Sequence, residues 1–244
     1  MADHDSGEKL PRRWMELMRA YDRARFDVMS SRATGKGGSA LAPRTRALIY
    51  VAVDLQTAHL YPDGAELNMR EALNHGATVE EISEVLGIAA TTTYQPFARC
   101  LRAALREFQL DGDAAPADAH ESLRRAFADY YGFVPEWLDF AIGVLPDIVP
   151  GLLSYVSMPQ RAPALDKKAR ALIFVGLNAS PPISDVDAVG QWGRRCKEAG
   201  ATAAEIAEAV AAGAMIGTHS FTRGYPVLHF ALQDHRDRHD LGYA

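Results

Sequence analysis

Apolar residues recur at helical spacing along most of this chain, and a similar polar turn interrupts them twice. The stretch ALNHGATVEEISEVL (72–86) returns in altered form as CKEAGATAAEIAEAV (196–210). After each Gly-Ala-Thr, apolar positions recur three and four residues apart, which is the spacing of one face of a helix. The sequence contains no alternating strand pattern bounded by hairpin turns, so it predicts an all-α protein.

Each Gly-Ala-Thr turn carries the signals of a corner between two helices. Gly76 and Gly200 suit the left-handed residue that follows a helix end. Thr78 and Thr202 suit the N-cap of the next helix, and a glutamate three residues later completes a capping box in both copies. These side chains are expected to bind backbone groups, so we assign them a role in the fold and none in chemistry.

One offset joins three pairs of matching segments. Gly76 and Gly200 are 124 residues apart (200 − 76 = 124). The same offset joins LAPRTRALIYVAV (41–53) to LDKKARALIFVGL (165–177), and Phe97-Ala98-Arg99 to Phe221-Thr222-Arg223. Unrelated helices would not keep one offset over three segments, so we infer an internal duplication. We expect two tandem helical repeats packed as one body: residues 1–110, a linker at 111–118, and residues 119–244.

Helical spacing and helix breakers predict the individual elements. Helices are expected at 9–30, 43–58, 64–75, 79–93, 97–109, 119–131, 135–157, 166–178, 187–199, 203–217 and 221–238. The run ALIYVAV is apolar nearly all round, so helix 43–58 should be central. Pro96, Pro146 and Pro150 are expected to kink or break their helices.

Composition and charge narrow the range of partners. The chain has 244 residues, 48% of them hydrophobic, which is enough for a buried core. Its net charge of −5 and the lack of a basic patch disfavour a nucleic-acid partner. No apolar run approaches the roughly 18 residues that a membrane span needs, and the polar start is unlike a secretory signal. Cys100 and Cys196 have no nearby partner in the sequence, which fits a reducing cytoplasm.

The two matched regions resemble the carboxymuconolactone decarboxylase / alkylhydroperoxidase D superfamily. The residues that carry the resemblance are LAPRTRALIYVAV…ALNHGATVEEISEVLGIAA and LDKKARALIFVGL…CKEAGATAAEIAEAVAAGA. The resemblance implies an all-α fold whose helical units assemble into trimers or hexamers, so two units per chain suggest a homotrimer. Because this fold hosts different chemistries, the resemblance is more informative about the fold than about function.

The chain departs from the motifs that carry chemistry in that superfamily. Peroxidase members have Cys-x-x-Cys followed four residues later by His, and the matching positions here hold Tyr61, Gly64 and Asn68, and then Asp185, Ala188 and Trp192. A thiol mechanism needs two sulfurs within bonding reach, so we reject this peroxidase activity. The histidine of decarboxylase-type members is also replaced, by Asn68 or Trp192, so any catalytic set is this chain's own.

Polar residues around the first site helix are the first candidates for chemistry. His59 is expected at the end of a central helix, where it could transfer a proton or only cap the last carbonyls. Asp54 interrupts an apolar run, so it needs a partner, and a salt bridge to Arg46 or Arg99 is the structural alternative to catalysis. Candidate substrate contacts in the same region are Tyr61, Asp63 and Asn68.

Candidates from the second repeat and from the ends of the site helices complete the set. His219 either faces a ligand or lies at a helix break with its ring nitrogens hydrogen-bonded within the fold. Arg99 and Arg223 occupy the same place in both repeats, where they could make structural ion pairs or bind a substrate carboxylate. Trp192 could line a pocket, although we favour a role in plugging a dead site. Tyr94 is a further candidate substrate contact.

These observations favour a cofactor-independent, decarboxylase-like lyase that acts on a small carboxylated or lactone-type metabolite by acid/base chemistry. His59, His219 and Asp54 are the expected catalytic residues. A hydratase, isomerase or ring-opening hydrolase on the same scaffold, and a non-catalytic small-molecule binder, are the alternatives. His235 and His239 have metal-ligand spacing without an evident third ligand, so no metal is expected. We expect a small-molecule substrate, a cytoplasmic homotrimer, and no nucleic-acid or membrane partner.

Overall fold

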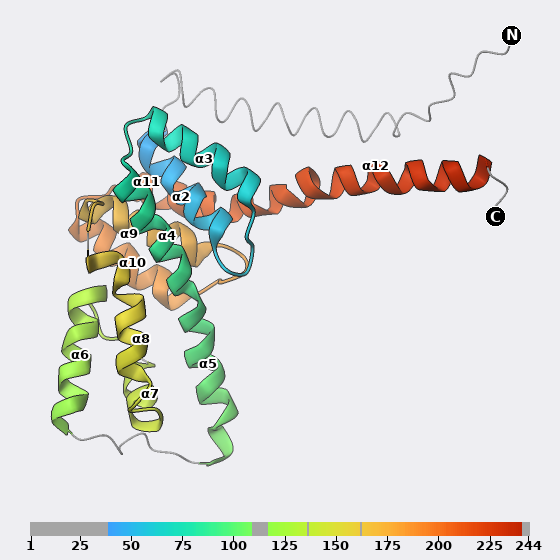
Figure 1. The fold of residues 1–244 in the computed structure, drawn as a ribbon. Coiled ribbons are helices and arrows are strands. Elements are labelled where there is room, and N and C mark those ends of the chain that lie inside the picture. The colour runs from blue at the N-terminus through green and yellow to red at the C-terminus, as the bar shows by residue number, and fades with distance from the viewer. Residues whose placement is uncertain (1–38, 109–116, 136, 162, 241–244) are drawn as a thin grey trace, which may run out of the picture. The chain divides into compact units, whose positions relative to one another are not determined.

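A computed structural model of the chain describes residues 39–108, 117–135, 137–161 and 163–240. Every regular element within these ranges is helical (Figure 1), which confirms the all-α prediction. Residues from Leu41 onward form one compact unit. The expected helix at 9–30 and most of the expected linker lie outside the described residues, and the predicted repeat boundaries stay predictions. None of the described helices combines the length and the apolar composition that a membrane span requires.

Three consecutive helices recur in the second part of the chain at the expected offset. They are α2 (Pro43–Leu55), α3 (Pro62–Asn74) and α4 (Val79–Ala90), and then α9 (Lys167–Ala179), α10 (Val186–Glu198) and α11 (Ala203–Ala214). Each later helix begins and ends 124 residues after its counterpart, as α9 does after α2 (167 − 43 = 124; 179 − 55 = 124). Below, residues 41–108 are the first half, residues 117–240 the second half, and positions 124 apart are equivalent.

The elements around these triplets differ more between the halves. After α4 come η1 (Thr91–Thr93), α5 (Tyr94–Ala104) and η2 (Arg106–Phe108), and after α11 come η4 (Met215–Thr218) and the longer α12 (His219–Asp240). The second half opens with α6 (Ala117–Tyr131), α7 (Leu138–Val144), α8 (Val149–Val156) and η3 (Met158–Arg161). Pro146 lies between α7 and α8, as predicted. Pro96 and Pro150 instead lie in the first turns of α5 and α8, where proline is tolerated.

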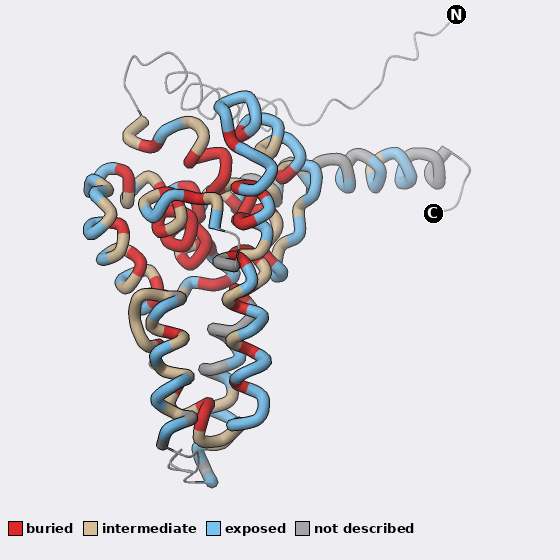
Figure 2. The backbone as a smooth tube through the Cα atoms, turned by 60° about the vertical axis from the view of Figure 1, so that its left-hand side comes forward, coloured by how far each residue is buried: buried red, intermediate tan, exposed pale blue. Residues whose placement is uncertain are grey.

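The apolar helices α2 and α9 pack against each other at the centre of the main core. Ile49 of α2 and Ile173 of α9 are fully buried, and Figure 2 shows the buried positions gathered in this part of the unit. Helices α9 and α11 approach closely, since a Cβ atom on Gly213 would lie 2.2 Å from the carbonyl oxygen of Gly176. A smaller core around Phe127 holds α6, α7 and α8 together.

The Gly-Ala-Thr corners have the predicted geometry. Gly76 and Gly200 have φ angles of +82° and +81°, in the left-handed region that favours glycine. Thr78 and Thr202 each form a complete capping box with the glutamate three residues later. Both corners are therefore explained by local backbone needs, and neither contributes to a site.

The two halves exchange equivalent hydrogen bonds across their interface. Glu84 Oε2 of α4 accepts from the backbone N–H of Leu165 at 2.8 Å, and Glu208 Oε2 of α11 accepts from that of Leu41 at 3.2 Å. The Glu84 carboxylate also accepts a 2.6 Å hydrogen bond from Nε of Arg170. Each half thus satisfies backbone groups that precede the central helix of the other half.

Candidate active site

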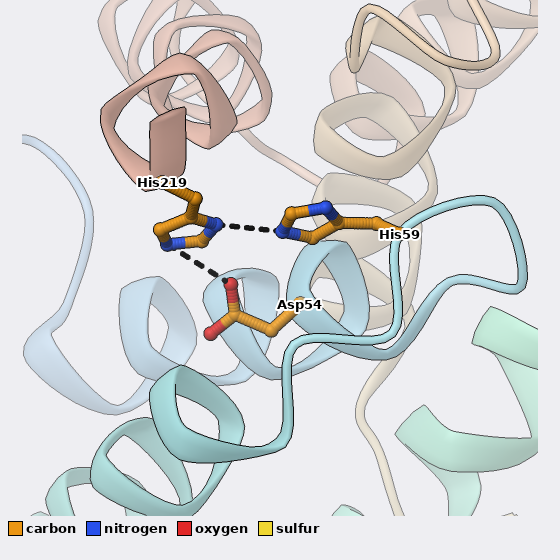
Figure 3. Close-up of side chains that lie close together, drawn as sticks. All are labelled: Asp54, His59 and His219. Atoms are coloured by element: carbon orange, nitrogen blue, oxygen red, sulfur yellow. Dashed lines mark hydrogen bonds and ion pairs between the residues drawn. The ribbon is translucent and has the colours of Figure 1, made fainter. Parts of the chain in front are cut away.

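Three ionisable side chains from distant parts of the chain meet beside the C-terminal end of α2 (Figure 3). Asp54 lies in the last turn of α2, and His59 lies in the loop that joins α2 to α3. His219 is the first residue of α12, so the second half completes a group that belongs otherwise to the first half. The prediction that His59 lies at the end of this helix is wrong, because α2 ends at Leu55 and His59 lies four residues further on, in the loop.

The three side chains form a chain of polar contacts. Nε2 of His59 lies 2.6 Å from Nδ1 of His219, and Nε2 of His219 lies 3.6 Å from Oδ1 of Asp54. The imidazole planes are 3° apart and their centroids 4.8 Å apart, so the rings meet edge to edge with nitrogen facing nitrogen. Two neutral nitrogens with facing lone pairs would repel, so one of the two facing atoms carries a proton.

Asp54 is buried beside two described partners. Its side chain is only 4% exposed, and Oδ2 accepts a 2.9 Å hydrogen bond from Nδ2 of Asn68 in α3. Helices α3 and α12 bring Asn68 and His219 to the end of α2, and the predicted alternative of a salt bridge to Arg46 or Arg99 stays a prediction. The hydrogen bond to Asn68 occupies Oδ2 and leaves Oδ1 on the side of His219.

The loop between α2 and α3 is shaped so that His59 points toward α12. The backbone N–H of Tyr61 donates to the carbonyl of Asp54 at 2.7 Å, and Leu60 has a φ of +46°. The equivalent residue Ser184 has a φ of +45°, so the two halves share this unusual turn. Partial burial lowers the pKa of His59 below its ordinary value, because burial disfavours the charged imidazolium.

Tyr61 joins the histidines to a charged pair at the edge of the site. Its ring centroid lies 4.1 Å from that of His219. The guanidinium of Arg223 lies over the Tyr61 ring, 4.7 Å from the ring centroid. Nη1 of Arg223 is 3.2 Å from Oδ2 of Asp63. The side chains of Arg223 and Asp63 are 54% and 66% exposed, so solvent reaches this pair. The structure therefore places a cation within reach of a ligand that approaches the histidines.

Comparison with known proteins agrees with this fold. Residues 15–107 match the profile of the carboxymuconolactone decarboxylase family. A protein from Burkholderia xenovorans LB400, provisionally named a gamma-carboxymuconolactone decarboxylase subunit, has a crystal structure that matches with a TM-score of 0.76. The two proteins are 25% identical, and the match covers 93% of each chain. Part of the chain is thus similar to the carboxymuconolactone decarboxylase family, and the whole fold is similar to that of the Burkholderia protein. No curated protein sequence matches it.

The positions that match the cysteines of peroxidase members hold Tyr61 and Gly64 in this chain. Tyr61 packs its ring against His219, and Gly64 provides space. A Cβ atom on Gly64 would lie 2.5 Å from Cδ1 of Tyr61 and 2.8 Å from Oδ2 of Asp54. The family match supports a decarboxylase-like function in general.

The equivalent region of the second half is filled by apolar and neutral groups. Asn178, Ile183 and Trp192 stand where the first half has Asp54, His59 and Asn68. Trp192 is buried and stacks on Phe174, with ring centroids 3.9 Å apart and planes 1° apart. Nδ2 of Asn178 donates to the carbonyl of Phe174 at 2.7 Å. Trp192 therefore lies in the core of the second half, and its suggested role in plugging a site stays a prediction.

Two further predicted contacts lie outside the described side chains. Tyr94 and Arg99 are part of α5, but the structure describes only their backbone. Of the ten predicted site residues, the structure brings together Asp54, His59, Tyr61, Asp63, Asn68, His219 and Arg223. Sequence reasoning did not identify Gly64 as a site residue, although its place in the superfamily's thiol motif was a usable signal.

Proposed function

We propose that the protein is a cofactor-independent, decarboxylase-like lyase that acts on a small carboxylated or lactone-type metabolite, with His59 as the group that transfers a proton. The contact that carries the proposal is the 2.6 Å approach of His59 Nε2 to His219 Nδ1, backed by Asp54. A histidine oriented by a second group that is itself fixed by a carboxylate follows the logic of catalytic triads.

The order of the three groups suggests which nitrogens carry protons. Asp54 attracts an N–H at Nε2 of His219, which leaves the lone pair of this ring at Nδ1. His219 Nδ1 then accepts from an N–H at Nε2 of His59, so the lone pair of His59 is at its far nitrogen, Nδ1. That atom is the proposed base and, once protonated, the proposed acid. The positive charge that develops on the imidazoles is stabilised by the Asp54 carboxylate.

In the proposed reaction, the bond between the substrate carbon and its carboxylate breaks and carbon dioxide leaves. The electron pair stays on the carbon, and His59 supplies the proton that this carbon takes up. Arg223 would bind a second carboxylate or a lactone oxygen of the substrate. To do so, Arg223 would release Asp63, its partner in the structure. Holding the proton donor, through its contact with His219, near the anion site lowers the entropic cost of the step.

The test is release of carbon dioxide from a panel of small carboxylated lactones and conjugated carboxylates. His59→Ala should abolish turnover of any substrate found, and added imidazole should restore part of it. His75→Ala is the matched control, because His75 is exposed and its partner among the described side chains is Glu71, four residues earlier on α3. Full turnover by His59→Ala, or equal losses in the two variants, would refute the role given to His59.

A further inference from the structure

We infer that Asp54, His59 and His219 form a binding site for a first-row transition-metal dication such as Zn²⁺. One ligand atom from each residue lies within 4.8 Å of the other two. Figure 3 shows the three side chains converging from α2, from the loop after it and from α12. The inference concerns binding alone, so it does not depend on the proposed lyase activity.

The donor set determines which cations fit. Two imidazole nitrogens and one carboxylate oxygen suit Zn²⁺, Fe²⁺ or Co²⁺, whereas Mg²⁺ and Ca²⁺ prefer oxygen ligands throughout. Three protein ligands leave at least one coordination position for water or for an oxygen of a bound small molecule. The site therefore has the composition of a metal centre that is open on one side.

The present distances show what must move to accept an ion. Bonds of about 2.0–2.1 Å to zinc place ligand atoms roughly 3.0–3.4 Å apart, while the two histidine nitrogens are now 2.6 Å apart. His59 lies on a loop, so its ring can withdraw by this small amount. His219 contacts His59 through Nδ1 and Asp54 through Nε2, and it can give one ion only one of these nitrogens, so the imidazole of His219 or the carboxylate of Asp54 must also turn. An ion would take the place of the hydrogen bond between the rings, so ion and hydrogen bond exclude each other.

A second contact prepares the carboxylate for a metal. Asn68 donates to Oδ2 of Asp54 at 2.9 Å, and this holds Oδ1 on the side of His219. Such hydrogen bonds to ligating carboxylates fix their orientation, and losing one costs about 10–100-fold in metal affinity. Arg223, a cation at the edge of the site, is paired with Asp63, so its charge is partly neutralised.

The test is titration of the chelator-stripped, full-length protein with Zn²⁺ by calorimetry, and with Co²⁺ by its visible absorption. We expect one ion per chain bound with nitrogen ligation. His59→Ala, His219→Ala and Asp54→Asn should abolish this binding, and Asn68→Ala should weaken it about 10–100-fold. His59→Ala is the variant least expected to disturb folding, because its side chain comes from a loop. Circular dichroism checks that each variant stays folded.

Two control variants separate this site from other histidines. His120→Ala removes another histidine paired with an aspartate, Asp139, and a double replacement of His235 and His239 removes the pair with metal-ligand spacing. Both controls should bind Zn²⁺ as the wild type does. The inference is overturned if the wild type binds no Zn²⁺, or if His59→Ala binds it unchanged, or if only the double replacement abolishes binding. Turnover measured with chelator present tests the lyase proposal separately.

Discussion

Replacing Gly64 with alanine should disturb the candidate site more than its size suggests. The added methyl carbon would lie 2.5 Å from Cδ1 and 2.6 Å from Cε1 of Tyr61, and 2.8 Å from Oδ2 of Asp54. Neither neighbour retreats freely. Oδ2 of Asp54 holds the hydrogen bond from Asn68, and the Tyr61 ring is enclosed by His219 and Arg223.

The size of the effect follows from two opposing terms. Forcing an extra methyl group into a packed site costs about 1–3 kcal/mol. Replacing glycine with alanine within a helix stabilises the helix by at most about 1 kcal/mol. We therefore expect Gly64→Ala to lower the free energy of unfolding by about 0–2 kcal/mol. Gly190→Ala in α10 is the matched control, because a Cβ atom there meets no atom within 4 Å. Gly190→Ala should raise the free energy of unfolding by about 0.5–1 kcal/mol.

Urea unfolding followed by circular dichroism measures both variants, and the difference between them isolates the clash. It should amount to about 1–3 kcal/mol in favour of Gly190→Ala. Gly64→Ala should also lose turnover, because the added methyl group displaces the side chains of Asp54 and Tyr61. If the two alanine variants are equally stable, or if Gly64→Ala keeps full activity, the close packing described around Gly64 is wrong.

Three other predictions concern parts of the fold outside the site. Glu84→Ala should lower the free energy of unfolding in urea by about 3–5 kcal/mol, because it removes the buried carboxylate that pairs with partly buried Arg170 and accepts from the backbone N–H groups of Ala164 and Leu165; a loss below 1 kcal/mol would contradict this. Burial tends to raise the pKa of Glu205, but hydrogen bonds from Lys168 and Thr202 outweigh it and lower the pKa below 4.5. Because the pKa is lower in the folded protein, ionised Glu205 stabilises the fold at any pH above 4.5, its pKa in the unfolded chain. This stabilisation is lost as the pH falls below that value through the folded pKa, so Glu205→Gln should flatten the acid side of a plot of stability against pH. Burial raises the pKa of Cys196 to about 12, so a thiol reagent at pH 8 should modify exposed Cys100 and spare Cys196 until the protein is unfolded.

The parts of the fold that the sequence could predict are those with local causes. The Gly-Ala-Thr corners depend on one left-handed residue and one capping box, and the central position of α2 follows from an apolar run of seven residues, ALIYVAV. The partners of Asp54 have no such local signal. His219 lies 160 residues from His59 in the chain, and only the packing of α12 beside the loop brings the two together. The end of α2 at Leu55 also escaped prediction, because Gln56, His59 and their neighbours continue a pattern that a helix would tolerate.

The comparison of the two halves suggests why only one of them holds ionisable groups at this place. A buried aspartate needs partners, and in the first half Asn68 and His219 supply them. In the second half the equivalent of Asp54 is the neutral Asn178, and Trp192 fills the space with a ring that stacks on Phe174. Fully burying a large apolar side chain contributes about 1.5–3 kcal/mol, so the filled half can offset the desolvation of charge in the other. A chain that contains both versions can therefore keep a polar, costly site on one side because the opposite side is packed as core. On this argument, restoring polar residues at Ile183 and Trp192 would destabilise the protein before it produced a second site.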